Sequence, residues 1–256
     1  QDADDGTPVV LIVLERERVG SLLAELESVL FADRVVLDDV SDAFDWLIVQ
    51  GPTAAALLDE TLPAREGAYE RSPAGAIATP QGEGVPGGAY VIQRSLTGDT
   101  GFVIALPAAD PASGPCAARL AAAAAAAGFG VLEEPALSEV IEILRIEAGG
   151  VRVGPDTAGR KRILPETGLE QQTVSYTKGC YLGQEVIARV RTYGRLPFAL
   201  RGLVLASDET GDDWTERTAL LDAVPAPGED LLLEDGKKIG QLASRTLSPV
   251  ADAAVV

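Results

Sequence analysis

The strand-like segments of this sequence come in pairs between helical segments, and this order constrains the fold more than any other feature. Runs rich in β-branched and aliphatic residues occupy positions 34–37 and 45–49, and a second pair occupies positions 90–93 and 102–106. A parallel sheet would instead require a helical crossover between successive strands. The sequence therefore predicts an α+β fold rather than a repeated βαβ unit.

Helical periodicity accounts for most of the remaining N-terminal sequence. A buried strand is expected at residues 9–14, followed by apolar residues that recur at helical spacing. Residues 67–88 are rich in Gly, Pro, Ala and Glu without periodicity, which predicts a loop. An alanine-rich helix is expected to end at Gly128, because Ala favours helices and Gly ends them. Helices are expected at residues 19–30, 53–58, 115–127 and 137–146 and around residues 186–190.

The sequence changes character near Phe198, where short strand-like segments replace the helical periodicity. Asp235-Gly236 is a hairpin signal between the last two of them. We expect two domains, residues 1–197 and a small β-rich domain at residues 198–256. The chain starts with Gln, contains no Met and ends within an apolar run, so we expect both termini to be incomplete. The C-terminal strands are expected at residues 200–205, 219–221, 231–233 and 239–243.

The absence of histidine excludes several kinds of catalytic site. Ser-His-Asp and Cys-His mechanisms need a histidine, and the chain has none. Its two cysteines, Cys116 and Cys180, are too few for a closed zinc site or an iron-sulfur cluster, each of which needs about four ligands. We therefore predict no metal site in this chain, and any cluster would be shared with a partner.

Charge and hydropathy restrict the partners. A net charge of -18 opposes general nucleic-acid binding, which depends on neutralising phosphates with Lys and Arg. The longest uncharged apolar stretch, residues 120–132, is rich in Ala and Gly and too short to cross a bilayer. The acidic N-terminus lacks the features of a secretory signal. We therefore expect no membrane partner and a cytoplasmic location.

Residues 178–185 (KGCYLGQE) form the segment least typical of simple packing. A thiol at or just before a helix N-terminus is favoured as thiolate by the helix dipole and unpaired N–H groups, and Lys178 adds a positive charge. Cys180 is therefore a candidate reactive thiol. The alternative is a buried cysteine that caps a turn, while Cys116 is expected to be a small buried apolar residue.

A local reversal of charge surrounds this segment. Between residues 178 and 201 the only acid is Glu185. A basic patch on an acidic protein attracts an anionic ligand such as a carboxylate tail or a phosphate, although a solvated face is the alternative. The basic residues of the segment are Lys178, Arg189, Arg191, Arg195 and Arg201.

A set of short motifs is distributed along the chain. They are residues 94–102 (RSLTGDTGF), 145–149 (RIEAG), 154–156 (GPD), 164–166 (LPE), 178–185, Arg189, 201–203 (RGL) and 240–249 (GQLASRTLSP). Together they resemble the YgfZ family of folate-binding proteins, relatives of the T-protein (aminomethyltransferase) of the glycine cleavage system, and the resemblance runs from about residue 9 to the end of the chain. It implies a T-protein-like folate-binding fold in residues 1–197, with its N-terminal part missing, and a truncated β-barrel-like domain in residues 198–256.

The resemblance also implies roles for single residues around a central tetrahydrofolate pocket. Glu166 takes the place of the T-protein's pterin-binding glutamate. The chemistry agrees, because a carboxylate can accept two hydrogen bonds from the pterin edge. An exposed loop acid is the alternative. Arg195 corresponds to an arginine that meets the folate tail. Tyr181 and Gln184 complete the expected folate-binding set.

The Lys-Gly-Cys sequence decides between the functions considered. Cys180 and Lys178 match the YgfZ family, whereas T-proteins lack this motif and a transferase needs no thiol. The first hypothesis is therefore a tetrahydrofolate-binding accessory protein for assembly or repair of iron-sulfur proteins, with those proteins or their assembly factors as transient partners and Cys180 and Lys178 as the residues that carry the chemistry. The alternatives are a tetrahydrofolate-dependent aminomethyl or one-carbon transferase and a structural adaptor without ligand.

Overall fold

The structure is a computed structural model that describes residues 10–32, 34–62, 77–157, 163–205, 221–222, 224–249 and 253–255. Its N-terminal part contains a four-stranded antiparallel sheet with strand order β1-β4-β3-β2. The mixed architecture confirms the α+β class. The strands are β1 (Phe44–Gln50), β2 (Ile77–Ala78), β3 (Tyr90–Gln93) and β4 (Gly101–Pro107).

The predicted pair at residues 90–93 and 102–106 is confirmed, because β3 and β4 lie antiparallel in register Val91 opposite Ile104. The predicted strand at residues 45–49 is also present as β1, but it pairs with β4 along its whole length. The short strand β2 lies inside the segment expected to be a loop, of which residues 67–76 fall outside the described residues.

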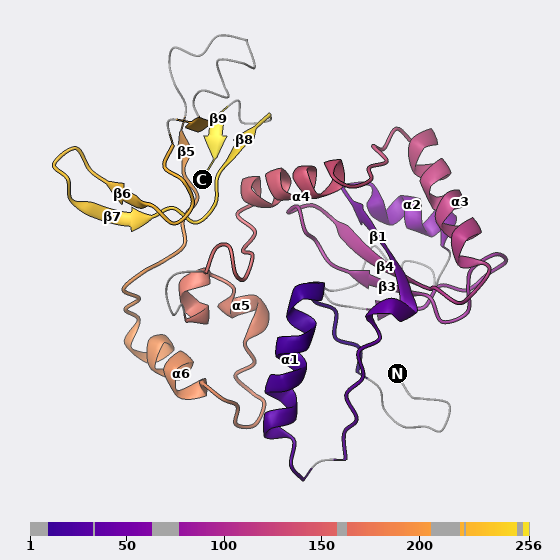
Figure 1. Ribbon diagram of the computed structural model, residues 1–256, viewed down its shortest axis with the longest axis horizontal. Coiled ribbons are helices and arrows are strands. Elements are labelled where there is room, and N and C mark those ends of the chain that lie inside the picture. The colour runs from indigo at the N-terminus through magenta and orange to yellow at the C-terminus, as the bar shows by residue number, and fades with distance from the viewer. Residues whose placement is uncertain are drawn as a thin grey trace.

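One face of the sheet carries the main hydrophobic core. The helices α2 (Ala54–Thr61) and α3 (Ser113–Ala126) pack against it, as Figure 1 shows. Phe102, Ile104 and Leu106 alternate along β4 and are all buried there. α3 confirms the alanine-rich helix that the sequence predicts. This helix places Cys116 in the core as a buried residue.

The segments that flank the first helix do not form the predicted strands. α1 (Arg16–Val29) confirms the helical periodicity, but the described residues 10–15 and 34–40 lie outside any sheet (Figure 1). A strand needs a neighbouring strand to satisfy its main-chain groups, and the described residues supply none at either segment. The strands expected at residues 9–14 and 34–37 are therefore wrong for the described positions.

The middle of the chain is helical. α4 (Ala136–Glu147) confirms the predicted helix and leads from the sheet toward the C-terminal strands. The short helices that follow are η2 (Leu164–Thr167) and α5 (Glu170–Thr173), and α6 (Gln184–Tyr193) confirms the periodicity around residues 186–190. A further short turn, η1 (Ser41–Ala43), precedes β1.

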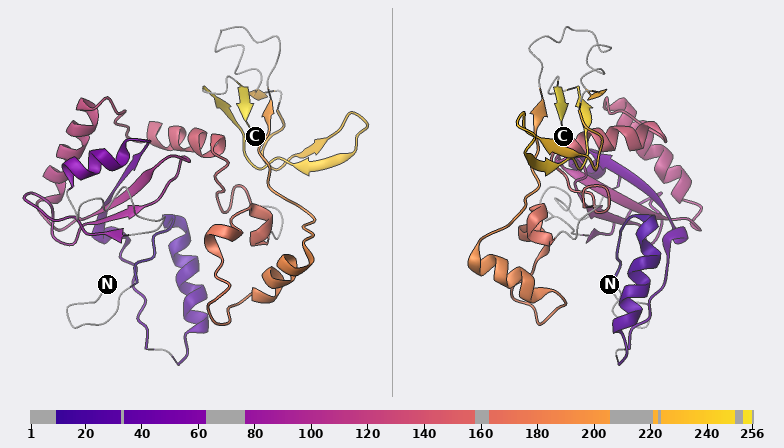
Figure 2. Two further views of the ribbon diagram at one scale, coloured as in Figure 1. Left: turned by 180° about the vertical axis from the view of Figure 1, so that it is seen from behind. Right: turned by 60° about the vertical axis from the view of Figure 1, so that its left-hand side comes forward.

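The C-terminal strands form two separate sheets (Figure 2). The hairpin of β6 (Asp230–Leu232) and β7 (Lys238–Gln241) confirms the turn at Asp235-Gly236. The other sheet has the order β5-β9-β8. Its strands are β5 (Val204–Leu205), β8 (Thr246–Ser248) and β9 (Ala253–Val255).

The expected β-barrel is not present among the described C-terminal strands, because the two sheets are not joined into a closed ring. Leu221 does not belong to a strand, and residues 219–220 lie outside the described ranges. Within those ranges, a helix with both the length and the apolarity to span a lipid bilayer is absent.

Candidate functional site

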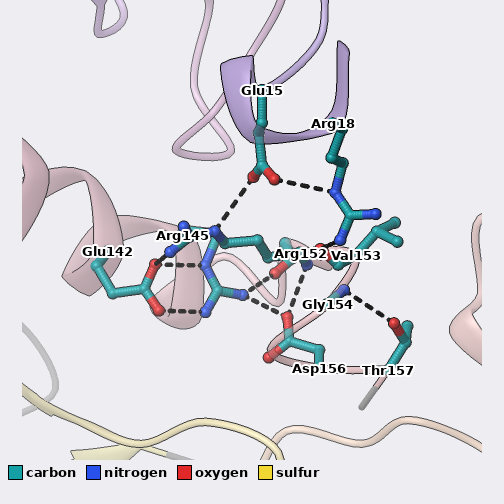
Figure 3. Close-up of polar contacts among 10 residues, drawn as sticks. Glu15, Arg18, Glu142, Arg145, Arg152, Val153, Gly154, Asp156 and Thr157 are labelled. Carbon is teal, nitrogen blue, oxygen red and sulfur yellow. Dashed lines mark hydrogen bonds and ion pairs between the residues drawn. The ribbon is translucent and has the colours of Figure 1, made fainter. Parts of the chain in front are cut away.

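The motifs at residues 145–149 and 154–156 meet at the C-terminal end of α4. The guanidinium group of Arg145 donates from Nη1 to Asp156 Oδ2 at 2.7 Å and to the carbonyl oxygen of Gly150 at 2.5 Å. Its Nε and Nη2 donate to the two carboxylate oxygens of Glu142 at 2.9 and 2.6 Å (Figure 3). Such paired hydrogen bonds fix a guanidinium in one orientation.

The charges of this cluster favour one another. Burial disfavours the charge on Arg145, but its hydrogen bonds and charge interactions with Glu142 and Asp156 outweigh burial, so the pKa of Arg145 is raised. The hydrogen bond from Arg145 lowers the pKa of Glu142. Both shifts favour the charged forms of Arg145 and Glu142.

Asp156 is nearly buried and uses only one of its carboxylate oxygens. Oδ2 also accepts from the main-chain N–H of Arg152 at 2.7 Å. Oδ1 is buried and has no hydrogen-bond partner within the described residues, and Figure 3 shows it pointing away from the guanidinium of Arg145. A buried acceptor without a donor favours binding of a donor group, whether from a water molecule or from a ligand.

A second set of contacts ties α1 to the same turn. Glu15, immediately before α1, accepts from Arg18 Nε and from Arg152 Nε, both at 3.2 Å. Arg18 Nη2 also donates to the carbonyl oxygen of Val153 (Figure 3). These contacts connect the start of α1 to the turn that follows α4.

A small cavity of about 120 Å³ lies next to the buried ion pair. Arg145 and Asp156 line it together with Thr167 of η2, Arg201 and Ser244. It therefore lies where α4, η2 and the C-terminal part meet. Small-molecule sites usually measure about 300–1,000 Å³, so this cavity alone would take only part of a ligand.

Glu166 does not itself line this cavity, but it directly precedes Thr167, which does. Its main-chain N–H donates to Ile163 and its carbonyl oxygen accepts from the N–H of Leu200, both at 2.9 Å. The residue is 7% exposed, so the alternative of an exposed loop acid is wrong. Its carboxylate has no hydrogen bond with any residue in the described part of the chain. The carboxylate oxygens are not among the fully buried atoms without a partner, so they keep contact with solvent and could accept from a ligand that presents N–H donors.

Cys180 is exposed and free, so the alternative of a buried cysteine that caps a turn is wrong. The helix that follows begins at Gln184, with Gly183 before it, so the thiol lies farther from the helix N-terminus than the sequence suggested. The argument from the helix dipole is correspondingly weaker, because that effect falls off within the first turn. Cys116, in contrast, is buried, and burial raises its pKa.

The other residues of the KGCYLGQE segment contact one another. Lys178 Nζ lies 4.8 Å from the centre of the Tyr181 ring, which is a cation–π contact. The main-chain N–H of Tyr181 donates to Gln184 Oε1 at 3.4 Å. The hydroxyl of Tyr181 is buried without a hydrogen-bond partner among the described residues. Tyr181 and Gln184 thus shape the loop that displays Cys180.

Some arginines of the basic segment contact other residues of the chain, and others do not. Arg191 stacks over the ring of Tyr176 at 4.0 Å, and Arg201 donates to the carbonyl oxygen of Leu200 and lines the cavity. Arg189 and Arg195 are exposed and form no ion pair within the part of the chain that the structure describes. Arg189 and Arg195 are therefore available to bind an anionic group.

The structure brings together only part of the predicted site. None of Glu166, Cys180 and Arg195 lines the cavity. Glu166 is connected to it through Thr167 and Leu200, which do line it. Within the described ranges, no group of three or more Cys, Asp or Glu side chains gathers where it could hold a metal ion. The Arg145–Asp156 ion pair was not predicted from the sequence. The signal for it was one charged residue in each of the motifs at residues 145–149 and 154–156.

The glycine-rich motif at residues 94–102 has a packing explanation. Gln50 of β1 donates from Nε2 to the carbonyl oxygen of Arg94 at 3.1 Å and accepts from the N–H of Leu96 at 2.9 Å. A Cβ at Gly101 would lie 2.1 Å from Gln50 Oε1, and one at Gly98 would lie 2.7 Å from Ala148 Cβ. These glycines allow close packing and carry no argument for a ligand.

Comparison with known proteins gives no family assignment. No protein-family model matches the chain, and no curated protein matches it. The resemblance to the YgfZ family therefore depends on the sequence motifs alone.

Proposed function

We propose that this chain is a tetrahydrofolate-binding accessory protein for the assembly or repair of iron-sulfur proteins. The observation that carries the proposal is the position of Glu166. The residue is 7% exposed, its carboxylate accepts no hydrogen bond from the described residues, and Thr167 and Leu200 next to it line a cavity. The pterin ring of a folate presents adjacent N–H groups that a carboxylate accepts as a pair. Glu166 would hold this edge, and Asp156 Oδ1 offers a further acceptor nearby.

The exposed thiol favours an accessory role over a transferase. A one-carbon transferase needs no thiol, whereas Cys180 is displayed on a loop where another protein can reach it. One thiol cannot hold a cluster alone, so its role in this proposal is a transient contact with a cluster-bearing partner. The bound folate would supply one-carbon or redox chemistry at the cavity, which Cys180 does not line.

Glu166→Gln tests the folate site directly. The substitution keeps the shape of the side chain but replaces one acceptor by an NH₂ donor, which then faces a donor of the pterin. We expect tetrahydrofolate binding to weaken by about 1–3 kcal/mol, which is roughly fivefold to 150-fold in Kd, measured by isothermal titration calorimetry. Glu139→Gln, an exposed position on α4, is the matched control and should bind as the parent does. Equal affinity in all three proteins would remove Glu166 from the site.

The length of the folate tail tests Arg195. Because this arginine is exposed and has no described ion-pair partner, a glutamyl tail should gain Coulombic attraction from it. We expect affinity to rise with the number of glutamates and to fall with added salt, and both trends to shrink in Arg195→Ala. Arg94→Ala removes the same charge from the turn after β3 and should keep both trends. If tail length has no effect in the parent protein, the arginine does not meet the tail.

A further inference from the structure

The N-terminal segments around α1 leave an apolar groove open. The groove, about 500 Å³ in volume, lies between residues 10–14, the apolar side of α1 and residues 36–41. No residue of α1 is buried, although Leu22, Leu23 and Leu26 face the groove. Apolar side chains in this arrangement remain in contact with water, and covering them would stabilise the protein.

The outer wall of the groove has the chemistry of an unpaired strand. Val36 is 83% exposed and Val35 is 54% exposed. The main-chain groups of residues 34–39 make no hydrogen bond with the main chain of any described residue. A run of β-branched residues with free N–H and C=O groups is a template for another strand.

We propose that residues 34–38 pair antiparallel with the same residues of a second copy of this chain, about a two-fold axis at Val36. The order of charges in the segment argues for this occupant. Arg34 begins the segment and Asp38 ends it, so this register places each arginine opposite an aspartate of the other copy. Val35 then lies opposite Leu37, and Val36 opposite Val36.

The two charged residues are free to form these contacts. Arg34 and Asp38 are exposed, and neither has an ion pair or hydrogen bond with the residues that the structure describes. Asp39, the adjacent acid, is already engaged, because it accepts from the N–H and the hydroxyl of Ser41. A partner strand from another protein would need the same order of charges, which this chain itself supplies.

The test measures the mass of the protein in solution. The parent chain of 26.6 kDa should reach twice that mass with rising concentration in sedimentation equilibrium. Val36→Asp places two carboxylates against each other at the axis and should leave the chain monomeric at every concentration at which the parent is dimeric. Val131→Asp makes the same change at an exposed valine outside the groove and should leave the dimer intact.

Charge reversal separates this pairing from general apolar association. Arg34→Asp and Asp38→Arg should each weaken the dimer, because each places like charges opposite one another. The double variant restores opposite charges in the same register and should restore the dimer. A parent chain that stays monomeric, or a folded double variant that is as weak as the single ones, would overturn the proposal.

Discussion

Asp156→Ala is expected to lower the free energy of unfolding by about 3–5 kcal/mol, because it leaves the buried guanidinium of Arg145 without one of its two carboxylate partners. The main-chain N–H of Arg152 loses its acceptor as well. Urea denaturation followed by circular dichroism measures the change. Asp156→Asn keeps an acceptor at the same place and should be less destabilised.

The exposed ion pair between Arg16 and Asp42 provides the control for this prediction. Its N–O distance of 2.8 Å is close to the 2.7 Å of the buried pair, but both side chains are in solvent. Asp42→Ala should therefore change stability little, because water screens and replaces an exposed pair. Equal losses in the two alanine variants would mean that burial does not decide the contribution of the Arg145–Asp156 pair.

Cys180→Ser is expected to abolish function in cells while sparing the fold. The change removes the nucleophile with little change of volume at an exposed position. The variant should unfold and bind tetrahydrofolate as the parent does, yet fail to restore the activity of iron-sulfur enzymes in cells that lack the protein. Full restoration by the serine variant would leave Cys180 without a functional role.

Cys116 serves as the internal comparison for the thiol of Cys180. It is 1% exposed and its pKa is raised by burial, so it reacts only when the core around α3 opens. Iodoacetamide at neutral pH should therefore label Cys180 faster by on the order of a hundredfold. Comparable rates in the folded protein would contradict the assignment of Cys180 as the reactive thiol.

The helices were predictable because their signals are local. In α4, apolar residues recur on one side, and in α3 the alanine run alone favours a helix. The β3–β4 pair was predictable for a similar reason, since its two strands are close in sequence. The strand β8 was missed, because three residues give too short a pattern to recognise.

The strands expected at residues 9–14 and 34–37 show the limit of such patterns. Their composition favours a strand, but a strand exists only where a second one completes its hydrogen bonds. The site shows a related limit. The sequence identified Glu166 and Cys180 as unusual, yet only the structure shows that Glu166 is buried next to the cavity-lining Thr167 and that Cys180 is exposed and does not line the cavity.

The last turn of α4 links the two parts of the chain more closely than the change in composition near residue 198 suggests. The hydroxyl of Ser248, on β8, donates to Glu147, two residues after Arg145. Ala148, the next residue along the chain, packs against Gly98. Opening of the C-terminal sheet would therefore loosen the same helical turn that holds the buried ion pair. Local unfolding of that sheet would then also loosen the cavity beside the ion pair and the turn at Gly98.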